Sequence, residues 1–150
     1  MDNIELKQFN AEKSETEIVN PQEYVDDYIN YIKERLKQAG FEIEIKKVSV
    51  GDSINVVIDF GRNNEHLGRI INGFRQDSVG LDAIGSKGGS GILEPLYAAD
   101  AEFFISKKII VKGKFIHPAT KTMFLRYYPN AVCKNEKKGQ YVYNPNKVKK

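Results

Sequence analysis

The stretch FEIEIKKVSVGDSINVVIDF, residues 41–60, predicts a β-hairpin at the centre of the fold. Apolar and charged residues alternate at its start, which is typical of a strand with one buried face. Val48 and Val50 fall out of that alternation, so a β-bulge is expected near Lys46. Gly51-Asp52-Ser53 predicts a turn, after which the chain returns as a second strand.

A helix is predicted immediately before this hairpin, over residues 21–39. Asn20 can cap the free N–H groups at its start, Pro21 fits the first turn, and Glu23 completes a capping-box pattern. Apolar residues then recur at helical spacing until Gly40, which supplies a left-handed end. We expect this helix to cover one face of the sheet.

The segments after the hairpin are less regular. A break is predicted over 61–64, and beyond it a short helix with apolar residues on one side: Leu67, Ile70, Ile71 and Phe74. Five glycines crowd residues 76–92, which indicates a long loop. Pro95 is expected to limit any helix near 93–101.

Alternation predicts two further strands, over 107–117 and 122–128, with a turn between them. The sequence therefore favours a single α+β domain with an antiparallel sheet of about four to five strands and two main helices. Its expected order is arm, helix, two strands, helix, loop, two strands and tail. The boundaries are an N-terminal polar arm over 1–20, a core over 21–130 that includes the Gly-rich loop 76–92, and a basic C-terminal tail over 131–150.

Charge is sorted by position along the chain. Twelve of the 23 basic residues lie between Phe103 and Lys150, together with one acidic residue, Glu136. The other 19 of the 20 acidic residues lie before Phe103. The modest net charge of +3 therefore conceals a strong dipole, which favours a polyanionic partner, DNA or RNA, for the basic part.

We accordingly predict a non-enzymatic nucleic-acid-binding accessory protein that uses a C-terminal sheet face and the tail. Cationic side chains neutralise phosphates, and exposed aromatic rings can stack on bases. The predicted contact residues are Lys108, Lys112, Lys114, Phe124, Arg126, Tyr128, Lys134, Lys137 and Lys138. The same lysines on a solvated strand would also prevent aggregation without any ligand, which is the competing interpretation.

The glycine-rich segment 85–91 is a second candidate site. It lacks the Walker A pattern, and it contains a Gly-x-x-Gly like that of KH loops without their flanking helices. Backbone N–H groups and one side-chain cation could hold a phosphate there, through Ser86, Lys87, Gly88 and Gly89. A flexible hinge or disordered loop is the alternative.

Two other classes of function stay open. A structural or interaction protein, such as a virion or assembly subunit or an inhibitor of a host factor, could use the charge dipole to bind protein or to self-assemble. A metal-dependent nuclease could use Glu44, Lys46 and Asp59, although the order of these residues is not the common one. No cofactor and no metal site are otherwise expected, because the two histidines and the single Cys133 lack ligand spacing.

The sequence has no apolar run that could span a bilayer and no signal peptide. We therefore expect no membrane partner and a reducing, cytoplasmic location, which is the host cytoplasm if a phage encodes the chain. In size and in the order of its expected elements the chain resembles small phage and plasmid accessory proteins. It shares no motif with a known family.

Overall fold

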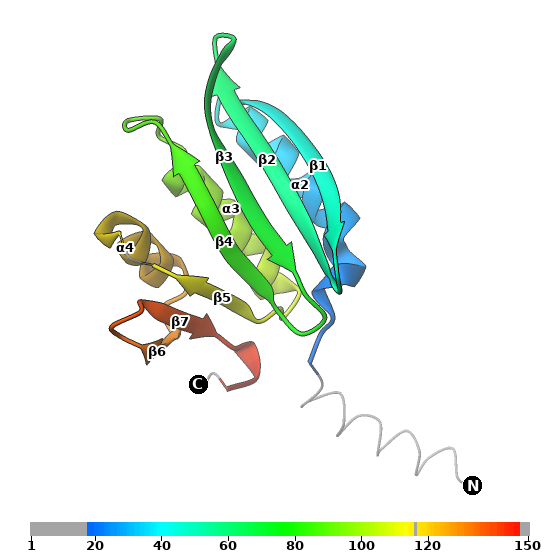
Figure 1. The fold of residues 1–150 in the computed structure, drawn as a ribbon, viewed down its shortest axis with the longest axis vertical. Coiled ribbons are helices and arrows are strands. Elements are labelled where there is room, and N and C mark those ends of the chain that lie inside the picture. Colours follow the sequence, from blue (N-terminus) through cyan, green and yellow to red (C-terminus); the bar gives the residue numbers. More distant parts are fainter. Residues whose placement is uncertain (1–17, 116, 148–150) are drawn as a thin grey trace, which may run out of the picture.

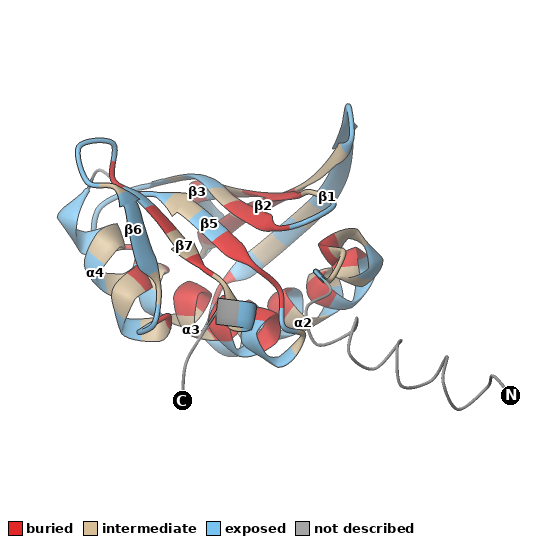
Figure 2. Cartoon of the chain, turned by 90° about the horizontal axis from the view of Figure 1, so that it is seen from below, coloured by how far each residue is buried: buried red, intermediate tan, exposed pale blue. Residues whose placement is uncertain are grey.

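The computed structural model describes residues 18–115 and 117–147. Most of the predicted arm, the residue between these ranges and the last three residues of the tail lie outside the described residues. Within them the chain forms a seven-stranded sheet with three α-helices on one face (Figures 1 and 2). The predicted α+β class is confirmed, with more strands and one more helix than expected.

The first predicted helix is present. A 3-10 turn over Pro21–Tyr24 (η1) leads into α2, Val25–Gln38. The Asn20 side chain accepts a hydrogen bond of 3.0 Å from the Gln22 backbone N–H, which is the capping contact that the sequence predicts. One stripe of α2 is buried beneath the sheet: Val25, Tyr28, Ile32 and Leu36.

The predicted hairpin is also present, as β1 (Glu42–Val50) and β2 (Ser53–Arg62). The predicted bulge is wrong, because the two strands pair along their whole length without a shift of register. Val48 and Val50 lie on the face of the sheet away from the helices, where they are 39% and 54% exposed. The two valines are therefore apolar residues on the uncovered face of a regular strand. The pattern of apolar residues along one strand cannot distinguish this arrangement from a β-bulge.

A strand follows the hairpin where a helix was predicted. This strand, β3 (Glu65–Phe74), pairs antiparallel with β2. Gly68 favours a strand here, because glycine weakens a helix and lets neighbouring strands approach closely. A Cβ atom on Gly68 would lie 2.2 Å from the carbonyl oxygen of Gly85 on the next strand.

The predicted loop over 76–92 contains another strand. β4 (Val79–Ser86) pairs antiparallel with β3, and a bulge interrupts this pairing. A shorter glycine-rich loop then leads into α3 (Leu93–Ser106). Pro95 lies in the first turn of α3, where its missing N–H is not needed, so it does not limit the helix as expected.

The C-terminal part differs most from the prediction. β5 (Val111–Lys114) is shorter than the strand expected over 107–117, and it lies parallel to β4 in a sheet expected to be antiparallel. The strand expected over 122–128 is wrong, because this segment belongs to a helix, α4 (Pro118–Tyr127). The His117 side chain caps α4 by accepting a hydrogen bond of 3.1 Å from a backbone N–H of its first turn.

Two short strands and a final 3-10 turn complete the described chain. β6 (Val132–Asn135) and β7 (Gln140–Tyr143) lie within the predicted tail, and η2 (Pro145–Lys147) follows them. The rings of Tyr141 and Tyr143 pack into the core, so this part of the predicted tail is docked on the sheet and helices. The strand order is β1-β2-β3-β4-β5-β7-β6.

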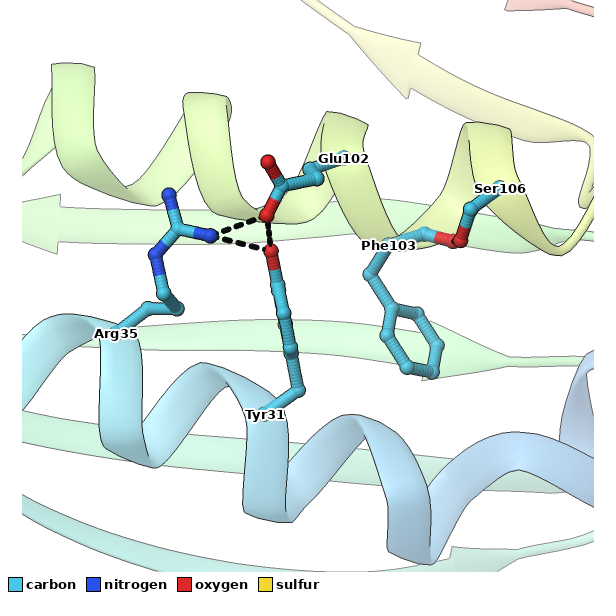
Figure 3. Close-up of polar contacts among 5 residues, drawn as sticks. All are labelled: Tyr31, Arg35, Glu102, Phe103 and Ser106. Carbon is cyan, nitrogen blue, oxygen red and sulfur yellow. Dashed lines mark hydrogen bonds and ion pairs between the residues drawn. The ribbon is translucent and has the colours of Figure 1, made fainter.

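The helices α2 and α3 lie beneath the sheet and contact each other through aromatic and polar side chains (Figure 2). The Tyr28 and Phe104 rings stack with centroids 5.1 Å apart. At the surface of this contact, Tyr31 and Arg35 both reach the Glu102 carboxylate (Figure 3). No helix in the described part of the chain is both long and apolar enough to cross a bilayer.

Candidate functional site

β4 and β5 diverge after a short region of pairing (Figure 1). The pairs run only from Val79↔Val111 to Leu81↔Gly113. β4 continues to Ser86, and on its β5 side this extension has no strand partner in the described structure. The divergence opens a hollow of about 760 Å³, here called the crevice, at the carboxyl ends of the two parallel strands. Open α/β sheets bind ligands at such ends.

Two helices begin at the crevice. Leu93 and Glu94 at the start of α3 line it, as do His117 and Ala119 at the start of α4. No described side chain caps the start of α3. The first turn of a helix carries N–H groups without intrahelical partners and the positive end of the helix dipole. Both features favour an anionic group in the crevice.

The loop between β4 and α3 adds further donors. The backbone N–H groups of Gly88, Gly89 and Gly91 make no hydrogen bond with any described residue. The N–H of Lys87 donates to the carbonyl oxygen of Leu67 at 2.9 Å, which fixes the loop against β3. Gly89 and Gly91 have φ angles of +79° and +77°, which favour glycine. Free N–H groups in such a loop can form an anion-binding concavity.

All four residues predicted to hold a phosphate line the crevice: Ser86, Lys87, Gly88 and Gly89. Lys87 forms an exposed ion pair of 2.6 Å with Glu65, and this contact lowers the pKa of Glu65. Exposed pairs contribute little free energy, so a bound anion can compete for Lys87. Glu94 is paired with Arg126 at 3.3 Å, which reduces its repulsion of an anion.

A second hollow, here called the groove, lies on the uncovered face of the sheet. It spans β4 to β6 and also measures about 760 Å³. Lys112 and Lys114 of β5 and Lys134 of β6 line it. None of these three ammonium groups forms an ion pair with a described residue. Three of the predicted nucleic-acid contacts therefore meet on one open surface.

The two predicted aromatic contacts lie elsewhere. Phe124 and Tyr128 are fully buried at the C-terminal end of α4, with ring centroids 4.7 Å apart. The Tyr128 hydroxyl is buried without a hydrogen-bond partner among the described residues, and burial raises its pKa. Neither ring can stack on a base in this structure. The prediction failed here because alternation over a few residues cannot exclude helical spacing.

The remaining predicted contacts are scattered over the surface, and none of them lines the groove. Arg126 is exposed on α4 and pairs with Glu94. Lys108 lies in the turn between α3 and β5 with a φ of +60°. Lys137 and Lys138 are exposed between β6 and β7.

The carboxylates of the nuclease hypothesis lie on the same face of the sheet. Glu44 and Asp59 are directly opposite each other on β1 and β2. Asp59 accepts hydrogen bonds of 2.8 and 3.2 Å from Arg69, and it contacts His66 at 3.1 Å. The Arg69 guanidinium lowers the pKa of Asp59. No cluster of three or more metal-ligating side chains occurs in the described ranges. The nuclease hypothesis stays a prediction without support from this geometry.

The crevice and the groove meet at the point where β4 and β5 separate. Leu81, Asp82 and Lys114 line both hollows. A molecule that extends along the crevice from the glycine-rich loop therefore reaches the groove at its far end.

No family model, no curated protein and no solved structure matches this chain. The geometry of the crevice and of the groove is therefore what indicates a function for this chain.

The crevice itself was not predicted from the sequence. Its signal is the order of three segments: an alternating stretch over 79–84, the glycine cluster over 85–91, and a mainly apolar stretch over 92–105. A strand, a glycine-rich turn and a helix in this order are typical of phosphate-binding loops. The parallel partner strand is distant in sequence, so pattern alone does not reveal it.

Proposed function

We propose that the crevice binds a small phosphate-bearing ligand that also carries an extended, amide-containing arm, which is the chemistry of coenzyme A. The observation that carries this proposal is the divergence of β4 and β5 beyond Leu81 and Gly113. It combines anion-binding groups at one end with an unpaired strand edge along one wall. The volume of the hollow lies within the usual range for small-molecule sites.

The phosphate end of the ligand lies at the glycine-rich loop. The free N–H groups of Gly88, Gly89 and Gly91 and the start of α3 supply donors there, and Lys87 supplies a charge. These are the groups that hold diphosphates at the turn between a strand and a helix.

The arm lies along β4. Beyond Leu81, as far as Ser86, the backbone of β4 pairs with no described strand on the β5 side. An extended chain with amide groups can pair with such an edge in the same way as a peptide adds a strand to a sheet. A ligand with phosphates alone would leave this edge unpaired, so calorimetric titration with coenzyme A, ADP and pantetheine tests both halves of the proposal.

The second candidate function is nucleic-acid binding through the groove. It is favoured by the convergence of Lys112, Lys114 and Lys134 on an open sheet face, with no ion pair to a described residue. The contacts are to phosphates, because none of the described residues that line the groove has a fully exposed aromatic ring. Of the nucleic-acid contact surface predicted from the sequence, only the cationic side chains remain in this candidate. Contacts to phosphates alone predict a weak preference for nucleotide sequence. A cytoplasmic accessory role, in a phage or mobile element, stays part of this candidate.

The two candidates can be separated because the hollows differ in their other residues. Lys112 and Lys134 line the groove alone, and Gly88 lines the crevice alone. Lys114 lines both, so changing it is expected to weaken either ligand and does not distinguish them.

A further inference from the structure

β1 forms one edge of the sheet. It pairs with β2 on one side, and on the other side no described strand follows it (Figure 1). β1 is nine residues long, and Val48 and Val50 on its uncovered face are exposed. A long free edge is a template for pairing with another chain unless the protein blocks it.

The charges of β1 disfavour several registers of pairing with a second copy and favour one. A two-fold axis that keeps the helices of both copies on one side of a joined sheet places residues of the same face opposite each other. Centring the axis on Glu44 opposes two glutamates, and centring it on Lys46 opposes two lysines. Centring it on Ile45 instead places Glu44 opposite Lys46 of the partner subunit, twice per dimer.

We propose that a second copy of this chain pairs with β1 in this antiparallel register and extends the sheet across the interface. Opposite charges on directly opposed residues stabilise a strand pair, and like charges destabilise it. The side chains of Glu44 and Lys46 are exposed on the uncovered face, and neither forms an ion pair with a described residue. They are therefore available for the contact, which is independent of what the crevice or the groove binds.

Sedimentation equilibrium of the wild-type chain and three variants tests the register. We expect a mass of twice 17.1 kDa for the wild type. Glu44→Lys and Lys46→Glu each oppose like charges, and each should weaken dimerisation by about tenfold or more. The double variant Glu44→Lys/Lys46→Glu restores opposite charges at both positions and should dimerise again.

The double variant also controls for loss of the fold, because it contains both substitutions. A wild-type chain that stays monomeric at high protein concentration overturns the proposal. Single variants that dimerise as tightly as the wild type overturn it as well, and so does a double variant that does not recover.

Discussion

The hydroxyl of Tyr28 on α2 donates a hydrogen bond of 2.5 Å to the Asp100 carboxylate on α3. The side-chain amide of Asn72 on β3 donates to the Tyr28 hydroxyl at 2.9 Å and to Asp100 at 3.4 Å. All three residues are buried, so one polar cluster connects two helices and the sheet inside an otherwise apolar core. Burial raises the pKa of Asp100 to about 7, and the hydrogen bonds from Tyr28 and Asn72 oppose this effect.

Asp100 makes stability depend on pH. Its pKa is higher in the folded chain than in the unfolded chain, so its charged form is disfavoured by folding. The contribution of Asp100 to the free energy of unfolding is therefore fully present below pH 4, and it is lost as the pH rises through about 7. We expect the free energy of unfolding of the wild type to fall by a few kcal/mol relative to Asp100→Asn between pH 5 and pH 8. Urea titrations at several pH values measure this difference, and a difference that does not change with pH would contradict the assignment.

Removing the Tyr28 hydroxyl leaves the buried Asp100 without its closest donor. Tyr28→Phe should therefore lower the free energy of unfolding by about 1–3 kcal/mol. Tyr31→Phe is the matched control, because the Tyr31 hydroxyl contacts Glu102 at the surface (Figure 3) and should contribute less than about 1 kcal/mol. Urea unfolding measures both losses. Equal losses in the two variants would show that the buried cluster stabilises the fold no more than the surface contact does.

Nucleic-acid binding through the groove predicts a specific change in salt dependence. Lys112→Gln/Lys134→Gln should weaken binding to DNA and RNA of any sequence and flatten the salt slope by about one unit per lost phosphate contact. Lys137→Gln/Lys138→Gln removes the same charge outside the groove and should have the smaller effect. Fluorescence anisotropy over a salt series measures both slopes. Equal effects would mean that net charge, and not the groove, attracts the nucleic acid.

The sequence predicts the elements whose local signals agree. Asn20 and Gly40 bound a helix with regular apolar spacing, and most of residues 41–60 alternate on the two sides of a glycine turn, so both elements are where they were expected. The segments with mixed signals were assigned wrongly. Leu67, Ile70, Ile71 and Phe74 match helical spacing, but pairing between β2 and β3 determines the structure there. Phe124 and Tyr128 match both periods over a short stretch, and the cap at His117 begins a helix.

The candidate site depends on contacts between distant segments, which explains why it was only partly predicted. The glycine cluster was recognised as a possible phosphate loop from its composition. Its position at the end of a strand became apparent only from the pairing of β4 with β3 and β5. The three groove lysines were identified from charge, but their shared face depends on the pairing of β5 with β7 and of β7 with β6.

The most direct test of the account is the binding of coenzyme A to the wild type, Gly88→Asp and Gly88→Asn by isothermal titration calorimetry. Among the described residues, no atom lies within 4 Å of a Cβ position on Gly88, and its φ is not positive, so both side chains fit without strain. They are nearly equal in size, and only Asp adds a negative charge beside the proposed phosphate site. We predict that coenzyme A binds the wild type more tightly than ADP or pantetheine, that Gly88→Asn retains binding, and that Gly88→Asp weakens it by at least about tenfold, or about 1.4 kcal/mol. No binding of coenzyme A to the wild type, or equal binding to the Asp and Asn variants, would contradict the account.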